Sequence, residues 1–225
     1  MEDGDAVPPA HASAKVTQHY PVALDLRSRS CLVVGGGSVA EAKVEGLLAA
    51  GACVTVVSPD LTSVLATWAG EGRIAHRPRE YEAEDLDGQQ LVFAATDRRT
   101  VTEMVTADAR RRGVWVNAAD DPAFCDFLLP AVLRRGRLTV AVSTGGASPA
   151  LAARVRNDLE AYLPPGYEEL VELAAEVRAE CIARGFRPGG SVWRGALERD
   201  LVDLLAEGKR GEARTRLLDR LGATA

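Results

Sequence analysis

Three consecutive glycines, Gly35 to Gly37, follow an apolar run and lead into a helix-like segment. Gly35, Gly37 and Ala40 match the pattern G-x-G-x-x-G/A, which binds dinucleotides when it lies between a strand and a helix. The first glycine allows a tight turn, the second lets a pyrophosphate approach the backbone, and the small third residue lets the helix pack on the strand. The alternative is a purely structural turn. We expect a cofactor site, because the helix start also offers free N–H groups to phosphates.

The strand that follows this helix ends in Ser58-Pro59-Asp60. In the common dinucleotide fingerprint an acidic residue here holds the ribose hydroxyls. Asp60 lies slightly late and beyond a proline, so its role stays open. No arginine follows directly, which argues against strict dependence on a 2′-phosphate.

Two further expected strands end in polar residues, Thr96-Asp97 and Asn117 to Asp120. In an open parallel sheet the carboxyl ends of the strands face the ligand crevice, so these side chains are candidates for binding or chemistry. Asp97 has an alternative role as the N-cap of a helix beginning at Thr100. Asp120 has one as a turn aspartate before Asp121-Pro122.

A second glycine turn, Ser143 to Pro149, precedes another helix. Ser148 is the expected N-cap and Pro149 the first helical residue. Whether the backbone amides of this turn also bind an anionic group is a separate hypothesis.

The elements that position these residues alternate between strand and helix. Strands are expected at residues 31–37, 52–59, 73–78, 91–97 and 114–120, and helices at 38–51, 61–70 and 100–113. This alternation predicts an α/β fold, a Rossmann-like parallel sheet with helices on both faces. After Pro122 the pattern changes to a hairpin-like pair within 127–143, and from Gly166 onward it is entirely helical.

Four segments follow from these patterns. They are a disordered tail at 1–19, a Rossmann domain at 20–116, a middle segment at 117–147 and a helical C-terminal domain at 148–225. The tail is acidic at its start and has no apolar core, so it is not expected to be a secretory signal.

Composition narrows the function classes. The formal net charge of -5 gives no general attraction to nucleic acid, and no apolar run reaches the roughly 18 residues of a membrane span.

The four cysteines are far apart in the sequence and lack the paired spacing of a structural zinc site. This spacing favours a reducing cytoplasm over a framework of disulfides. All basic residues except Lys15, Lys43 and Lys209 are arginine, through composition bias or because some of them bind carboxylates or phosphates.

Three stretches together resemble the precorrin-2 dehydrogenase family, the dehydrogenase and ferrochelatase portion of siroheme synthase. They are YPVALDLRSRSCLVVGGGSVAEAKVEGLLAAGACVTVVSP, then LVFAATD, then VNAADDPAFCDFLLPAVLRRGRLTVAVSTGGASPALA. Their order and separation match over about residues 20 to 165. GGGxVAxxK together with TGGxSPxLA is far more specific than a glycine loop alone.

The resemblance implies an NAD-dependent oxidation of precorrin-2 to sirohydrochlorin in siroheme, and hence porphyrin-type, biosynthesis. It also implies a homodimer formed through the middle segment. The family's cofactor positions fall at Ser38, Val39, Pro59 and Asp60, beside Gly35, Gly37, Thr96 and Asp97 from the pattern. No methyltransferase domain, which some relatives carry, is expected within these residues.

The family's central aspartate falls at Asp120, the hypothesised general base. The serine that often precedes the second glycine pair is Thr144 here, which keeps the hydroxyl, and Thr144 and Gly145 are candidates for substrate binding. The arginines considered for the substrate carboxylates are Arg98, Arg134, Arg135 and Arg154, with solvated surface arginine as the alternative for each.

Insertion of Fe²⁺ or Co²⁺ into sirohydrochlorin, which some family members perform, stays open. The histidines are His11, His19 and His76, and they suggest no resident metal site. Two other functions compete: a dinucleotide-sensing regulatory module without turnover, and a dehydrogenase acting on another substrate. Neither requires Asp120 together with the second glycine turn.

Overall fold

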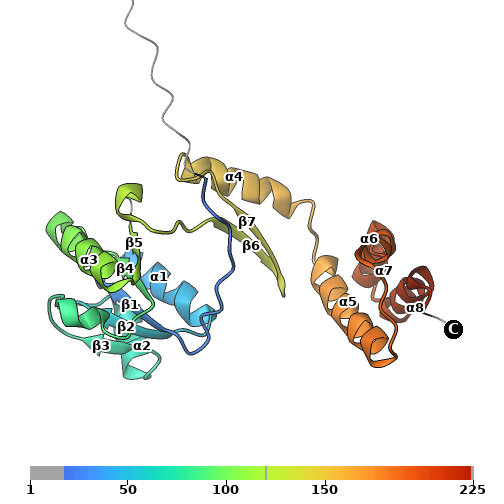
Figure 1. The fold of residues 1–225 in the computed structure, drawn as a ribbon, viewed down its shortest axis with the longest axis horizontal. Helices are drawn as coiled ribbons and strands as arrows, with labels where there is room; N and C mark the ends of the chain where they lie inside the picture. Colours follow the sequence, from blue (N-terminus) through green and yellow to red (C-terminus); the bar gives the residue numbers. More distant parts are fainter. Residues whose placement is uncertain (1–17, 120, 224–225) are drawn as a thin grey trace, which may run out of the picture. The chain divides into compact units, whose positions relative to one another are not determined.

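A computed structural model describes residues 18–119 and 121–223 (Figure 1). Most of the predicted N-terminal tail, residues 1–17, therefore lies outside the described residues, as does Asp120. The chain divides into two compact units, Met1–Leu128 and Leu129–Ala225. The predicted middle segment, 117–147, begins in the first unit and ends in the second, and its boundaries stay a prediction.

The first unit is built on a five-stranded parallel sheet with the strand order β3-β2-β1-β4-β5. Its strands are β1 (Ser30–Val34), β2 (Cys53–Val57), β3 (Ala75–Arg77), β4 (Leu91–Ala94) and β5 (Trp115–Ala118). Its helices are α1 (Ser38–Ala49), α2 (Ser63–Gly70) and α3 (Arg99–Arg112), with 3₁₀ turns η1 (Ala83–Leu86) and η2 (Pro122–Phe124). The predicted Rossmann-like fold is confirmed.

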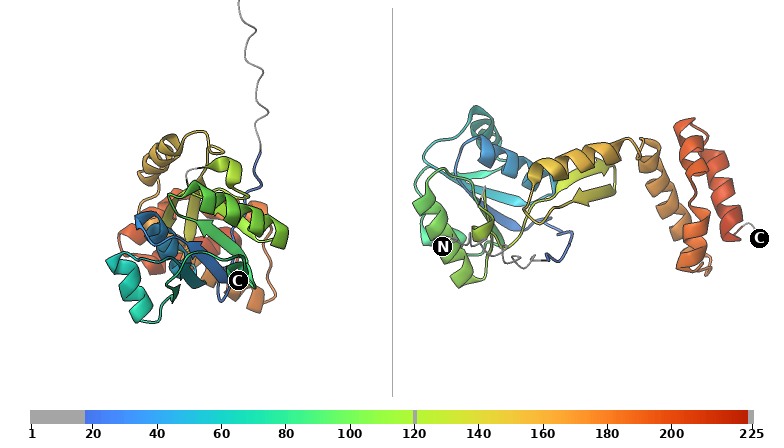
Figure 2. Two further views of the ribbon diagram at one scale, coloured as in Figure 1. Left: turned by 90° about the vertical axis from the view of Figure 1, so that its left-hand side faces the viewer. Right: turned by 90° about the horizontal axis from the view of Figure 1, so that it is seen from above.

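Alternate residues of the strands feed two separate cores. Cys31 and Val33 of β1 pack against α1 and α2, whereas Leu32 and Val34 pack against α3 and η1. The period of two is what a strand covered on both faces requires. As a result α1 and α3 lie on opposite sides of the sheet (Figure 2).

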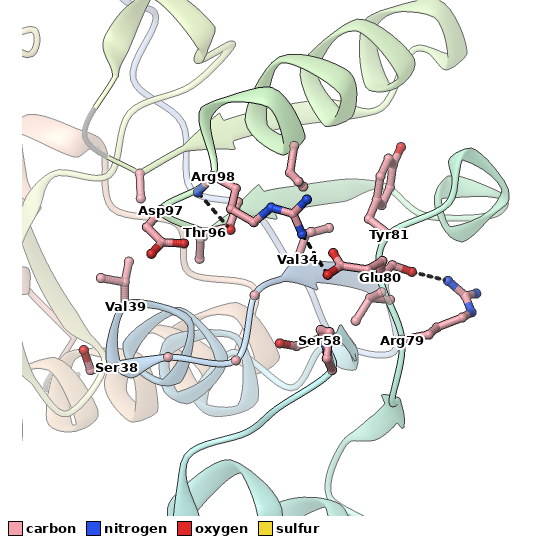
Figure 3. A pocket seen from close by; sticks show the side chains of 18 residues that line it. Val34, Ser38, Val39, Ser58, Arg79, Glu80, Tyr81, Thr96, Asp97 and Arg98 are labelled. Atoms are coloured by element: carbon pink, nitrogen blue, oxygen red, sulfur yellow. Dashed lines mark hydrogen bonds and ion pairs between the residues drawn. The ribbon is translucent and has the colours of Figure 1, made fainter.

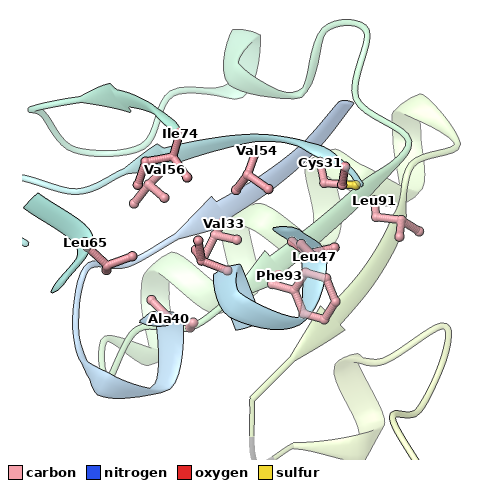
Figure 4. Packing of buried hydrophobic residues seen from close by; sticks show 13 residues of the cluster. Cys31, Val33, Ala40, Leu47, Val54, Val56, Leu65, Ile74, Leu91 and Phe93 are labelled. Atoms are coloured by element: carbon pink, nitrogen blue, oxygen red, sulfur yellow. The ribbon is translucent and has the colours of Figure 1, made fainter. Parts of the chain in front are cut away.

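The core under α1 explains why the glycine loop holds its position. Figure 4 shows Ala40 and Leu47 of this helix facing Val33 of the central strand. Ala40 is fully buried, as the third position of the glycine pattern predicts. The helix ends at Ala49 with Ala50 as its C-cap, and Gly51 follows with a φ of +76°, the left-handed conformation expected of a glycine just beyond a helix.

The second unit begins with an antiparallel hairpin, β6 (Ala131–Arg135) and β7 (Leu138–Val142), which the sequence predicted. α4 (Pro149–Glu160) packs on both strands. Ser148 is its N-cap, with the hydroxyl accepting a hydrogen bond from the Leu151 amide at 3.2 Å, and Pro149 is its first residue.

Four helices complete the second unit: α5 (Gly166–Ala183), α6 (Gly190–Ala196), α7 (Arg199–Ala206) and α8 (Arg210–Leu221). They share one apolar core, in which Leu173, Leu201 and Leu217 are fully buried. The predicted all-helical C-terminal region is confirmed. Across the part of the chain that the structure covers, no helix combines the length and apolar character needed to cross a bilayer.

Candidate functional site

A pocket of about 490 Å³ opens at the carboxyl edge of the parallel sheet (Figure 3). This size is within the range of pockets that hold small ligands. Its walls come from the glycine loop, the end of β2, the segment after β3, the segment after β4, and Ala119 after β5. The ligand crevice therefore forms where the topology of a doubly wound sheet predicts it.

The three glycines of the loop have different surroundings. Gly35 has a φ of +122°, and a Cβ there would lie 2.1 Å from the carbonyl oxygen of Ala95. A Cβ on Gly36 would lie 1.9 Å from the carbonyl oxygen of Asp60. A Cβ on Gly37 would meet nothing within 4 Å, so open space lies where the fingerprint brings the pyrophosphate.

The first turn of α1 adds hydrogen-bond donors to this wall of the pocket. Its N-cap, Gly37, has no side chain to satisfy the free N–H groups, and the backbone hydrogen bonds of the helix begin with Glu41 N–H to Gly37 at 3.0 Å. Ser38 and Val39 line the pocket, and Val39 is 44% exposed. Free amides and the positive end of the helix dipole are suited to a phosphate group. The loop thus fits a dinucleotide.

The segment at the end of β2 lines the pocket with Ser58 and Pro59, and not with the acidic residue Asp60. Ser58 and Pro59 line the pocket, whereas Asp60 is exposed and is not among the lining residues. The Thr62 amide bonds to the Gly36 carbonyl at 2.9 Å, which holds this segment against the glycine loop. A ribose contact by the Asp60 side chain stays a prediction, without support from its position.

Thr96 and Asp97 line the pocket after β4, as the position of this strand predicted. Asp97 is not a helix cap: α3 has Arg98 as its N-cap and no side-chain cap. The Thr96 hydroxyl accepts the Arg98 amide at 3.2 Å, so it organises this turn. Arg98 also lines this pocket, and its contact with substrate carboxylates stays a prediction.

Sequence reasoning missed the wall formed by Arg79, Glu80 and Tyr81, which follows β3. The rule applied to the fourth and fifth strands, that polar residues beyond the carboxyl end of a strand face the crevice, would have found it. Across this wall the Arg98 guanidinium donates to the Glu80 carboxylate at 2.7 Å (Figure 3).

Asp85 of η1 holds this wall in place. Its side chain is fully buried and accepts two hydrogen bonds from Arg79, at 2.7 and 2.8 Å, and one from the Glu82 amide at 2.9 Å. Arg77 pairs with the same carboxylate. Burial by itself raises the pKa of Asp85, but the hydrogen bonds from Arg79, Glu82 and Arg77 outweigh it and lower the pKa below its ordinary value. Asp85 therefore stays ionised and orients Arg79.

The segments on either side of residue 120 are held by a set of short-range contacts. Asn117 donates through its side-chain amide to the Phe127 carbonyl at 2.9 Å, and the Cys125 thiol donates to the Ala118 carbonyl at 3.2 Å. Burial raises the pKa of this thiol, so it stays protonated and able to donate. Both contacts join the residues before position 120 to the residues after it. The candidate base Asp120 itself lies outside the described residues.

The candidate substrate residues belong to the second unit. The Thr144 hydroxyl donates to the Ser148 carbonyl and accepts from the Ser148 amide, both at 3.0 Å, and Gly145 has a φ of +64°. Arg135 donates to Glu160 at 2.9 Å and to the Leu163 carbonyl at 3.2 Å, which are structural contacts.

Arg134 is exposed on β6, and Arg154 pairs with Asp158 one turn further along α4. Within residues 18–119 and 121–223, no three His, Cys, Asp or Glu side chains gather as a metal site.

Two family models match the chain. A model described as putative NAD(P)-binding covers residues 22–131, and one described as sirohaem biosynthesis protein central covers residues 135–162. Siroheme synthase from Methylococcus capsulatus is 40% identical over 210 residues, which are 92% of this chain and 44% of the relative. Siroheme synthase from Methylobacillus flagellatus is 45% identical over 169 residues, 75% of this chain and 36% of the relative.

A solved structure, "SirC, precorrin-2 dehydrogenase", superposes with a TM-score of 0.68 at 29% identity and covers 91% of this chain and 99% of that one. The chain spans less than half the length of the two siroheme synthases, 44% and 36%.

Proposed function

The chain belongs to the precorrin-2 dehydrogenase family, and we propose that it oxidises precorrin-2 to sirohydrochlorin with NAD⁺, a step of siroheme biosynthesis. The observation that carries the proposal is the pocket at the carboxyl edge of the sheet, where the glycine loop and the first turn of α1 meet. The similarity to siroheme synthases and to SirC supports the choice of substrate.

Gly35, Gly37, Ser38 and Val39 are the residues that would hold the pyrophosphate, through backbone amides and the open space at Gly37. Ser58 and Pro59 would border the adenosine, and Thr96 and Asp97 line the pocket beyond β4. Bound NAD⁺ supplies a hydride acceptor for a ring carbon of the substrate.

β5 ends at this edge of the sheet, and Ala119, which precedes Asp120 in the sequence, lines the pocket. A carboxylate there would take the proton that leaves the macrocycle as the hydride departs, which is the role of a general base. Thr144, Gly145 and Arg134 are proposed to bind the carboxylates of the substrate. For Arg135, the bonds to Glu160 and Leu163 support positioning of β6 more than a direct contact.

We also propose that the chain works as a homodimer in a reducing cytoplasm. The dimer is supported by an apolar stripe on α4, where Leu151 and Val155 lie one turn apart and are 53% and 37% exposed. Four free cysteines, two of them buried, fit a reducing compartment.

Incubation of the purified protein with precorrin-2 and NAD⁺ tests the function. We expect NADH and sirohydrochlorin to appear together in equal amounts. Asp120→Ala should lower kcat at least about 100-fold and leave NAD⁺ affinity within about twofold, because a general base acts on the chemical step. The matched control is Asp87→Ala, since Asp87 is exposed and is not among the lining residues.

Normal turnover by Asp120→Ala would remove Asp120 from the mechanism. NAD⁺ binding by folded wild-type protein without turnover of precorrin-2 would instead support the sensor hypothesis. The same assay with sirohydrochlorin and Fe²⁺ or Co²⁺ tests metal insertion.

A further inference from the structure

The residues at the end of β2 do not show which side chain would accept hydrogen bonds from the adenosine ribose of the cofactor. The fingerprint places an acid there, but Ser58 and Pro59 line the pocket and Asp60 does not. Among the lining residues that the structure describes, the acidic ones are Glu80 and Asp97. These two carboxylates are the candidates for hydrogen bonds with the adenosine ribose.

Sheet order distinguishes the two. β3 is the parallel neighbour of β2, with Val57 opposite Arg77, and the Ser58 amide bonds to the Arg77 carbonyl at 3.2 Å. Glu80 follows Arg77 by three residues and so lies on the Ser58 side of the pocket. Asp97 follows β4, which lies on the other side of β1. Glu80 is the acid nearest in topology to the ribose position.

Contacts around Glu80 hold its backbone in place, whereas its exposed carboxylate is free to exchange its partner for a ligand group. Arg79 donates to the Glu80 carbonyl at 2.9 Å and is itself oriented by buried Asp85. The carboxylate pairs with Arg98 at 2.7 Å, and the two side chains are 62% and 57% exposed. An ion pair this exposed contributes little to stability, so ligand groups can compete for either partner.

We propose that Glu80 accepts hydrogen bonds from the adenosine ribose hydroxyls and, together with Arg98, sets the preference for NAD⁺ over NADP⁺. This rests on the proposed function, since it assigns the cofactor of that reaction. NADP⁺ carries a phosphate in place of the 2′-hydroxyl, and that phosphate would meet the Glu80 carboxylate. Arg98 offers the phosphate little attraction while Glu80 neutralises its charge.

Equilibrium titration of the purified protein with NADH and NADPH, followed by their fluorescence, tests the assignment without turnover. Wild-type protein should bind NADH more tightly than NADPH. Glu80→Gln should weaken NADH binding about tenfold, because a charged acceptor is lost, and should tighten NADPH binding about tenfold, because Arg98 is released. The gain for NADPH should shrink as salt rises from low to physiological concentration.

Two further variants isolate the pair. Glu80→Gln with Arg98→Ala should keep the loss for NADH and show no gain for NADPH, because the gain comes from the freed guanidinium. Glu103→Gln is the matched control: it removes one charge from a pair with Arg99 on α3, and neither residue is among the pocket lining. Its ratio of affinities should equal that of wild type.

The outcomes separate this proposal from the function itself. Wild-type protein that binds neither dinucleotide would overturn the proposed function and the assignment together. Wild-type protein that prefers NADH, with an unchanged ratio of affinities in Glu80→Gln, would overturn the assignment alone. A gain for NADPH that persists in the double variant would contradict the part given to Arg98.

Discussion

Gly36 and Gly37 are adjacent residues, yet an added side chain would meet very different surroundings at the two positions. At Gly36 a Cβ would lie 1.9 Å from a backbone carbonyl oxygen, that of Asp60. At Gly37 it would lie in open space at the pocket. One glycine is required by packing within the protein, and the other leaves room for a ligand.

Substitutions at these two positions should therefore fail in different ways. Gly36→Ala should lower the free energy of unfolding by about 1–3 kcal/mol, because the Ser58–Asp60 segment must shift to make room. Gly37→Asp should leave the unfolding midpoint nearly unchanged and weaken NAD⁺ binding at least about tenfold, since it brings negative charge to the pyrophosphate. Denaturant unfolding and NADH titration of both variants measure the two effects.

Gly37→Ala serves as the control for size without charge and should retain most of the affinity. Unchanged NAD⁺ binding in a folded Gly37→Asp variant would mean that the pyrophosphate does not approach this residue.

For single residues, the sequence pattern predicted that glycines are needed in this loop, but it gave the reason for only some of them. G-x-G-x-x-G/A leaves Gly36 as an unspecified position, because its constraint comes from the Asp60 carbonyl, 24 residues away along the chain. The strand-end rule locates Glu80 at the pocket, but the sequence does not show that β3 pairs with β2, the pairing that brings Glu80 beside Ser58. Tertiary contacts of this kind leave no local pattern.

Among the elements, periodicity and capping residues located most strands and helices correctly. Ser148-Pro149 at α4 and Gly113 after α3 are local signals, and both helices begin or end there. The break between α6 and α7 has no such signal, because Ala196 to Arg199 contains neither glycine nor proline. The turn lets Ala196 and Leu201 both enter one core, where each is nearly fully buried.

Asp200 connects α7 to α8 at the partly exposed edge of that helical core. It accepts hydrogen bonds from Arg220 at 2.8 and 2.9 Å and from Arg216 at 2.8 Å. These bonds, that of Arg220 first, lower the pKa of Asp200 to about 2. Because this lies below the unfolded value of about 3.9, ionised Asp200 stabilises the fold above about pH 4.

The contribution of Asp200 should thus be lost as the pH falls toward about 2. Asp200→Asn should lower the free energy of unfolding by about 1 kcal/mol at neutral pH, a value reduced to allow for solvent screening of a partly exposed pair. The difference from wild type should shrink steadily below about pH 4. Urea unfolding at a series of pH values measures it, followed by Trp193 fluorescence with Trp68 and Trp115 replaced by Phe.

Asp203→Asn is the matched control, since Asp203 is exposed on the same helix. A difference between Asp200→Asn and wild type that stays constant from neutral pH to about pH 2.5 would show that charge is not its source.

For the whole molecule, the open question is what covers the apolar surface of α4 and the hairpin. A two-stranded hairpin is only marginally stable by itself, and in β6 and β7 only Leu133 is buried. Leu151 and Val155 of the adjoining α4 remain 53% and 37% exposed. A second copy of the chain, packed on this stripe, would bury them.

Leu151→Asp should therefore weaken the dimer about 10- to 100-fold, because it replaces a side chain worth about 1.5–3 kcal/mol when buried with a charge. Sedimentation velocity over a range of protein concentrations measures the change, with circular dichroism to verify that the helices persist. Ala150→Asp is the matched control: Ala150 is exposed on the same helix but precedes the stripe by one residue, which turns it by about 100°. Wild-type protein that sediments as a monomer at every concentration, or a Leu151→Asp variant that dimerises as wild type does, would contradict an interface through α4.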